Sequence, residues 1–311
     1  MKVCVTGGTG FVGSRLVEVL LERGDAVQVL TRSAQKAKAK FAKLPSEQQS
    51  RLTLTQYDPL SPSQWASELT GCEAIVNLAG ENLAGERWTP QKKKDIRLSR
   101  IDGTEKLVEA IAQLDSKPSV MVSASAVGYY GADEQKEFTE DSDPGSGFLA
   151  EICKDWEAAA AKVKDLSVRL VQVRIGIVLG PEGGALAKMT GPFQAFIGGP
   201  IGSGKQWLSW IHRDDLVGII AAGISNAQMS GTFNATAPNP QRMEAFCQTL
   251  GEVMARPSWF PVPSFALEAL FGESAEVVLT GQQVLPKNAQ AAGYEFQYPT
   301  LKPALQQILV G

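Results

Sequence analysis

The 311-residue sequence contains no apolar run close to the roughly 18 residues that a membrane-spanning helix requires. Its first predicted strand begins at Lys2, so we expect no cationic, apolar leader. The net charge of -3 provides no general basic surface for nucleic acid. The cysteines lack the paired spacing of a zinc site or a disulfide-rich secreted fold; they are Cys4, Cys72, Cys153 and Cys247. We therefore expect a cytoplasmic protein with no metal, no nucleic-acid partner and no membrane partner.

Two kinds of apolar segment alternate before about residue 180. MKVCVTGG is a short β-branched run that ends in glycines, and FVGSRLVEVLLERG has apolar residues at helical spacing. Further strands are predicted in AVQVLTR, RLTLTQYD, EAIVNLAG, PSVMVSASA and SVRLVQVRIGIVLG, and a long helix in TPQKKKDIRLSRIDGTEKLVEAIAQL. Strands this apolar, separated by helices, predict an α/β fold with a doubly wound parallel sheet covered on both faces.

The segment TGGTGFVG joins the first predicted strand to the first predicted helix. Gly7, Gly10 and Gly13 allow the backbone to turn tightly, to approach a pyrophosphate and to pack the helix on the sheet. A helix N-terminus also favours phosphate through its free N–H groups and its dipole. Glycine spacing alone suits a purely structural turn as well, but between a strand and a helix it predicts a dinucleotide site. The residues predicted to line this site are Thr6, Gly7, Gly10, Phe11, Val12 and Gly13.

The end of the second predicted strand indicates which dinucleotide binds. An acidic residue at this position would bind the ribose 2′-OH of NAD. Thr31, Arg32 and Ser33 stand there instead, and a guanidinium with two hydroxyls suits a 2′-phosphate. The alternative is that Arg32 is only a solvated surface residue. The predicted cofactor is NADP(H), which makes residues 1–235 a Rossmann-like NADP(H)-binding domain, with substrate-side loops from about residue 180. Residues 236–311 are predicted to form a small C-terminal α/β lobe that contributes to substrate binding.

With these features the chain resembles the extended short-chain dehydrogenase/reductase superfamily. The resemblance is closer to an atypical "epimerase family" branch of bacteria and plastids, sometimes described as cell-division-inhibitor-like. The segments that carry it, besides TGGTGFVG, are NLAGEN, SASAVGYYG, GFLAEICKDWE, RIGIVLGPEGGAL, GGPIGSGKQWLSWIHRDDL and AGYEFQYPTLKPAL. They span nearly the whole chain.

The resemblance implies roles for several further residues. Leu78, Ala79 and Gly80 are expected to line the cofactor after the fourth strand, and Ile177 and Val178 are expected at the end of the sixth, beside the nicotinamide. Arg100 stands where related enzymes often have an asparagine near the nicotinamide ribose. Ser125 and Tyr129 match the catalytic serine and the turn that follows it. From the residues alone, Ser125 is equally well a strand terminus with a satisfied hydroxyl.

One expected motif is missing. The superfamily's Tyr-x-x-x-Lys pair, which transfers a proton and holds the ribose, is replaced in GFLAEICK by Phe148 and Ile152. These positions share a helix face, whereas Lys154 is rotated away from it. The only literal Tyr-x-x-x-Lys, from Tyr298 to Lys302, contains a proline and is not expected to form a helical catalytic pair.

Two other segments invite functional interpretations that compete with simpler ones. GPIGSGKQ lacks the final hydroxyl of a phosphate-binding Walker loop and precedes a predicted strand, so a substrate-side loop is favoured. His212, the only histidine, precedes Asp214 and Asp215, either of which can cap the next helix. We favour this helix-entry role over catalysis, because the sequence places no Ser or Cys partner beside the histidine.

These observations predict an atypical NADP(H)-dependent oxidoreductase or epimerase-like enzyme that acts on a small oxygenated substrate. The missing tyrosine and lysine support an alternative, a non-catalytic NADP(H)-binding sensor or scaffold, linked to cell or organelle division. Whether the protein is an enzyme stays open at this point, as do its substrate and the direction of hydride transfer.

Overall fold

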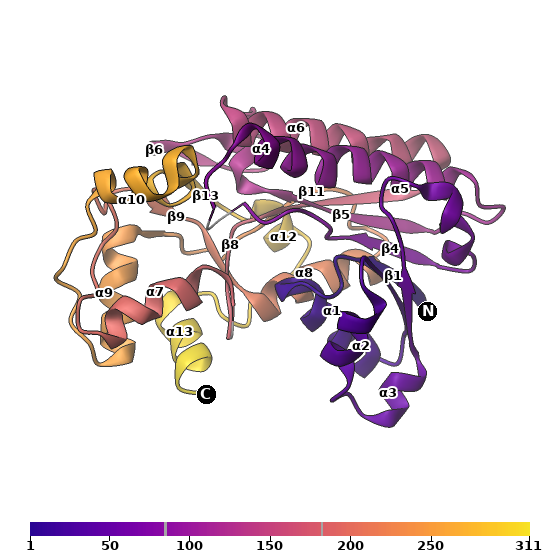
Figure 1. Cartoon of the computed structure of the whole chain (residues 1–311), viewed down its shortest axis with the longest axis horizontal. Coiled ribbons are helices and arrows are strands. Elements are labelled where there is room, and N and C mark those ends of the chain that lie inside the picture. The colour runs from indigo at the N-terminus through magenta and orange to yellow at the C-terminus, as the bar shows by residue number, and fades with distance from the viewer. Residues whose placement is uncertain (84–85, 182) are drawn as a thin grey trace.

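Figure 1 shows the computed structural model, which describes residues 1–83, 86–181 and 183–311. Its centre is a seven-stranded sheet in the order β11-β7-β5-β4-β1-β2-β3, and all its neighbouring strands are parallel. The strands are β1 (Lys2–Thr6), β2 (Ala26–Thr31), β3 (Leu52–Gln56), β4 (Ala74–Asn77), β5 (Val120–Ala126), β7 (Arg169–Ile175) and β11 (Gly231–Ala235). The strand order reverses direction between β1 and β4, so the predicted doubly wound sheet is confirmed.

Helices cover both faces of this sheet, as Figure 1 shows. The helices on one face are α1 (Phe11–Glu22), α2 (Ala34–Phe41) and α8 (Arg213–Ser225), and those on the other are α5 (Gly103–Ala112) and α6 (Phe148–Ala161). Strand residues alternate between the two cores: Val3 and Val5 pack with α1 and α8, while Cys4 between them packs with α5. Burial on both faces explains why the strands read as continuous apolar runs.

Two segments depart from the sequence prediction. The long predicted helix is divided into α4 (Pro90–Arg97) and α5 by a π-helical turn, η3 (Leu98–Asp102). The last predicted strand is divided at Gly176 into β7 and a separate strand, β8 (Ile177–Leu179), which pairs with β10 (Trp210–His212). A Cβ atom on Gly176 would lie 2.3 Å from the carbonyl oxygen of Ser209, so only glycine allows this close approach.

The remaining elements lie in the C-terminal part of the chain, and three of their helices build a separate apolar core. They are α7 (Gly184–Gln194), β9 (Trp207–Leu208), β12 (Gln241–Arg242), α9 (Met243–Met254), α10 (Ser264–Phe271), α11 (Glu276–Leu279), β13 (Gln282–Val284), α12 (Lys287–Ala291) and α13 (Leu301–Leu309). Helices α7, α9 and α13 share one core, whereas Ala289 of α12 packs in the core beneath the main sheet. Strand β13 pairs with β6 (Asp133–Phe138), and α3 (Ser46–Ser50) precedes β3. The division of the chain at residue 235 stays a prediction.

Helix α8 begins differently from the prediction, because the histidine itself is the cap. The N–H of Asp214 donates to Nδ1 of His212 at 3.1 Å, so neither aspartate that follows provides the capping oxygen. Nε2 of His212 lies 3.0 Å from Oε1 of Gln307, which accepts a hydrogen bond only if Nε2 is protonated. Both contacts therefore require the neutral ring. Asp215 is also buried and accepts hydrogen bonds from the N–H groups of Gln297 and Tyr298.

This arrangement predicts that the contribution of His212 to stability depends on pH. Burial lowers the pKa of His212, so below pH about 6.5 the unfolded chain binds more protons than the folded protein. The stabilisation is complete above that pH and is lost as the pH falls toward the lowered pKa. We expect His212→Asn, which can still cap the helix, to lose about 1 to 3 kcal/mol at pH 7.5 and less at pH 5.5. Urea unfolding of both proteins tests this; a constant difference across this range contradicts it.

Candidate active site

A cavity of about 350 Å³ lies at the carboxyl ends of the central strands, where ligands bind in open parallel sheets. Its wall is mostly apolar and comes from segments that are far apart in the sequence. The wall includes Val12, Leu78, Gly80, Arg100, Ser125, Ile152, Cys153, Trp156, Ile177, Val277 and Gln282. Burial raises the pKa of Cys153 to about 11, so this residue stays a neutral thiol at physiological pH.

The glycine-rich turn at one side of the cavity has no room for side chains. Gly7 has a φ of +69°, and a Cβ there would lie 2.6 Å from the carbonyl carbon of Leu78. A Cβ on Gly13 would lie 2.2 Å from the carbonyl oxygen of Gly7. Within the described part of the chain, no side chain caps the N-terminus of α1, whose cap residue is Gly10. The turn therefore presents free backbone N–H groups, as a pyrophosphate site requires.

The other residues of the predicted motif have different surroundings. The hydroxyl of Thr6 is buried and donates to Oδ1 of Asn77 at 2.7 Å, so it joins β1 to β4 instead of facing the turn. The ring of Phe11 packs beneath the guanidinium of Arg213, at 5.2 Å, and Val12 lines the cavity.

Thr31, Arg32 and Ser33 lie at the carboxyl end of β2, where Thr31 is the last residue of the strand. Thr31 is buried, and the hydroxyl of Ser33 caps α2 by accepting from the N–H of Lys36 at 3.4 Å. The side chain of Arg32 is 80% exposed, and its nearest acid is Glu81 at 4.0 Å. Its guanidinium is thus open to a phosphate, although a solvated arginine has the same exposure.

The remaining predicted cofactor residues gather near the end of β4. Leu78 and Gly80 line the cavity, and the backbone of Ala79 lies against Gly7. Arg100 reaches the same cavity from η3. Ile177 and Val178 lie in β8, beyond the break at Gly176, and not at the end of β7. Of the two, Ile177 lines the cavity.

Ser125 occupies the end of β5 and is joined to a buried ion pair. Its hydroxyl donates to Oε1 of Glu157 at 2.7 Å, because a carboxylate can only accept. Glu157 in turn receives two hydrogen bonds from Arg174, at 2.8 and 2.9 Å, and the exposed fractions of these two side chains are only 11% and 5%. Burial opposes the charge of Arg174, but the hydrogen bonds that it donates to Glu157 raise the pKa of Arg174 overall. The oxygen of Ser125 therefore keeps acceptor capacity at the cavity wall, where it also lies within hydrogen-bond reach of the Cys153 thiol.

Tyr129 packs against this ion pair and not against the cavity. The guanidinium of Arg174 lies 3.4 Å from the ring centroid of Tyr129 and also donates to the hydroxyl of Tyr130 at 2.8 Å. That hydroxyl donates to Oδ1 of Asn234 on β11, and burial raises its pKa to about 12. The catalytic role of Tyr129 stays a prediction. Its ring has a structural role, because it packs against the guanidinium of Arg174.

Helix α6 separates the two residues that replace the missing pair. Ile152 is buried and lines the cavity, as its predicted position requires. Phe148 packs instead on Trp88, with ring centroids 5.2 Å apart, and beneath Lys93. Lys154 is exposed. The face of α6 that meets the cavity therefore carries no titratable group able to replace the lysine.

Glu157, Trp156 and the wall from Val277 to Gln282 are site residues that the sequence analysis did not identify. One signal was available, because Arg174 is a charge near the end of a mostly apolar strand and a buried charge requires a partner. No spacing rule links it to Glu157, which is on a helix. The C-terminal wall had no local signal at all.

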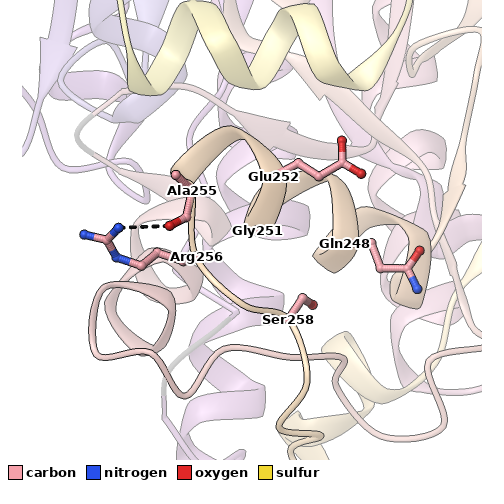
Figure 2. A pocket seen from close by; sticks show the side chains of 6 residues that line it. All are labelled: Gln248, Gly251, Glu252, Ala255, Arg256 and Ser258. Atoms are coloured by element: carbon pink, nitrogen blue, oxygen red, sulfur yellow. Dashed lines mark hydrogen bonds between the residues drawn. The ribbon is translucent and has the colours of Figure 1, made fainter.

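Two other features were considered as sites. In the Walker-like segment, Lys205 is exposed and precedes strand β9, which contradicts phosphate-loop geometry. A second hollow, of about 480 Å³, lies at the C-terminal end of α9. Figure 2 shows the residues that line it, among which Arg256 donates to the carbonyl of Ala255. Its remaining walls are Gln248, Gly251, Glu252 and Ser258, and neither the glycine turn nor Ser125 contributes. Among the described residues, no helix is long and apolar enough to cross a membrane.

Both the sequence and the fold match those of known proteins. Residues 3–235 match the model of the NAD dependent epimerase/dehydratase family. The chain belongs to this family. A second model, a domain of unknown function (DUF1731), matches residues 262–308. In this member of the epimerase/dehydratase family, the segment from Val277 to Gln282 contributes to the cavity wall. That segment lies within the second match.

Several relatives resemble the whole chain. The chloroplastic homologue of epimerase family protein SDR39U1 from Arabidopsis thaliana is 48% identical over 99% of this chain and 87% of its own length. Epimerase family protein YfhF of Bacillus subtilis is 38% identical over 99% of this chain and 98% of its own. The crystal structure of human epimerase family protein SDR39U1 (isoform 2) with NADPH has a TM-score of 0.88, 35% identity and 100% coverage of both chains. The resemblance to the extended short-chain dehydrogenase/reductase superfamily is confirmed.

The buried pair of Glu157 and Arg174 yields a prediction about stability. Glu157→Gln leaves a buried guanidinium without its counter-charge, which typically costs about 3 to 5 kcal/mol. Removing both charges, with Glu157→Gln and Arg174→Met, should cost less than the single change. Asp155→Asn on the same helix is the matched control, because its pair with Arg97 is exposed and should be worth under about 1 kcal/mol. Urea unfolding measures all four proteins; equal losses for the two single variants contradict the prediction.

Proposed function

We propose that this protein is an NADP(H)-dependent oxidoreductase or epimerase-like enzyme acting on a small oxygenated substrate. The observation that carries the proposal is the continuity of the cavity with the cofactor turn. Val12 beside the glycines and Ser125 at the end of β5 line one space, so a cofactor at the turn and a substrate at Ser125 would meet there. A sensor or scaffold needs no such second compartment, and the comparisons do not favour that alternative.

The residues of the turn fit a dinucleotide. The glycines leave the backbone bare, and the uncapped N-terminus of α1 suits the pyrophosphate. Arg32 is free to pair with a 2′-phosphate, which supports NADP(H) over NAD(H), as does the NADPH held by the human relative. When bound, the nicotinamide supplies or accepts a hydride. The four cysteines are free and buried, consistent with the expected cytoplasmic location, which stays part of this proposal.

The groups that can donate or accept a proton at the cavity restrict the kind of substrate that would react there. Ile152 on the cavity wall and Phe148 beside Trp88 provide no acid, and the hydroxyl proton of Ser125 is committed to Glu157. Among the described residues that line the cavity, Glu276 is the one carboxylate. Ser125 can therefore accept a hydrogen bond from a substrate hydroxyl more readily than it can donate one to a carbonyl. The mostly apolar wall suits a small substrate with few polar groups. The site is thus better arranged for an alcohol than for the reduction of a ketone.

The first prediction from this proposal concerns Arg32. Arg32→Ala should weaken NADPH binding by about 1.5 to 3 kcal/mol, the range for hydrogen bonds to charged groups, and leave NADH nearly unchanged. Lys40→Ala is the matched control, because it removes an exposed cation from α2, the helix that Ser33 caps. Fluorescence titration with both cofactors measures the effect. A wild-type preference for NADH, or equal losses for the two cofactors, rules out the assignment.

The second prediction concerns turnover. General acid–base catalysis contributes about 10² to 10⁴-fold, and this cavity lacks the usual acid. The wild-type protein should therefore bind NADPH tightly yet oxidise it slowly or not at all with simple ketones and common nucleotide sugars. Absorbance assays measure turnover, and a parallel binding titration establishes that the cofactor site is saturated. Ketone reduction at rates normal for the superfamily would contradict our reading of the site.

A further inference from the structure

Arg100 is a buried cation that lacks a complete set of partners. The residue is 9% exposed, and its Nη1 atom has no hydrogen-bond partner among the residues that the structure describes. Burial lowers the pKa of Arg100, but a guanidinium stays charged in proteins. An unsatisfied buried charge is costly, so it is retained where a ligand completes its hydrogen bonds. Arg100 faces the cavity described above, where such a ligand would lie.

The local backbone brings this guanidinium to the cofactor side of the cavity. Arg100 lies in the π-helical turn η3, and turns of this kind occur frequently at functional sites. Its guanidinium carbon would lie 3.2 Å from a Cβ on Gly80, in the segment that follows β4. On its other side it lies 5.2 Å from the ring centroid of Trp156 on α6.

Arg100 lies beside the face of α6 on which the missing lysine would stand. Trp156 is one helical turn beyond Ile152 on the same face of α6, and both residues line the cavity together with Arg100. The guanidinium therefore lies against the helix face where the lysine of the superfamily would project. The nearby carboxylate of Glu81 does not satisfy Arg100, because it forms a 2.9 Å pair with Lys92.

We propose that Arg100 supplies, from η3, the positive charge that Ile152 lacks on α6, and that it binds the hydroxyls of the nicotinamide ribose. The inference rests on the proposed binding of NADP(H) and adds the residue that holds its nicotinamide half. Guanidinium contact with Gly80, which follows β4 at the glycine turn, favours the cofactor over a substrate anion as the partner. The protein thus keeps a cation for ribose binding while it loses the tyrosine that would use it to transfer a proton.

The experiment compares two ligands that share the adenosine half. NADPH contains the nicotinamide ribose, whereas 2′,5′-ADP does not. Arg100→Met should weaken NADPH roughly 10- to 150-fold, the range for hydrogen bonds to a charged group, and leave 2′,5′-ADP unchanged. Arg32→Ala, in contrast, should weaken both ligands, because both carry the 2′-phosphate. Isothermal titration calorimetry measures both affinities without reference to turnover.

A rescue variant separates ribose binding from a structural role on Trp156. Adding Ile152→Lys to Arg100→Met returns a cation to the same space from α6 and should restore most of the lost NADPH affinity. If Arg100→Met does not fold, Arg100→Gln, which keeps hydrogen-bond donors without the charge, replaces it in both measurements. Unchanged NADPH affinity, an equal loss for 2′,5′-ADP, or failure of the added lysine to rescue overturns the inference. A wild-type protein that binds neither ligand overturns the proposed function instead.

Discussion

The contact between Gly13 and the carbonyl of Gly7 is the constraint on which the candidate site depends. Because no side chain separates them, α1 starts directly above β1, and its N-terminal N–H groups open at the carboxyl edge of the sheet. The same turn lies against the backbone of Leu78, so β4 ends beside it. One point of close packing thus sets the positions of the anion site, the segment that carries Gly80 and the mouth of the cavity.

From this point the site divides into two electrostatically different halves. The cofactor side has cations with incomplete partners, in Arg32 and Arg100. The substrate side has a saturated network, in which Arg174 is bonded to Glu157 and Tyr130 and Ser125 completes the carboxylate. A side with unsatisfied charges is prepared to bind, whereas a saturated network is rigid and holds its members in place. The proposed site therefore combines cations that can bind a cofactor with a serine whose hydroxyl proton is already committed.

Features set by local backbone chemistry were predictable from the sequence. The glycine turn, the alternation of apolar strands with helices, and the position of Ile152 on α6 depend on residues close together in the chain, and the structure places them as expected. Phe148 on the same helix packs on Trp88 instead of the cavity, a contact with a distant segment that no local pattern predicts. The break at Gly176 and the cap by His212 were not predictable, because they depend on Ser209 and Gln307 from other segments. Glu157 and Arg174 were likewise missed as a pair, since their 17-residue separation follows no helical or strand period.

The wall from Val277 to Gln282 and the glycine turn come from different parts of the chain. Gln282 donates to the backbone of Val127, and β13 pairs with β6, so this wall is fastened to the Rossmann part at two places. The residues of the glycine turn lie in the segment that matches the epimerase/dehydratase model, whereas this wall lies in the segment that matches the domain of unknown function. Sequence drift in the wall can reshape the cavity while the anion site is preserved. Substitutions between Val277 and Gln282 can therefore change the space available to a substrate without altering the backbone that would hold the cofactor.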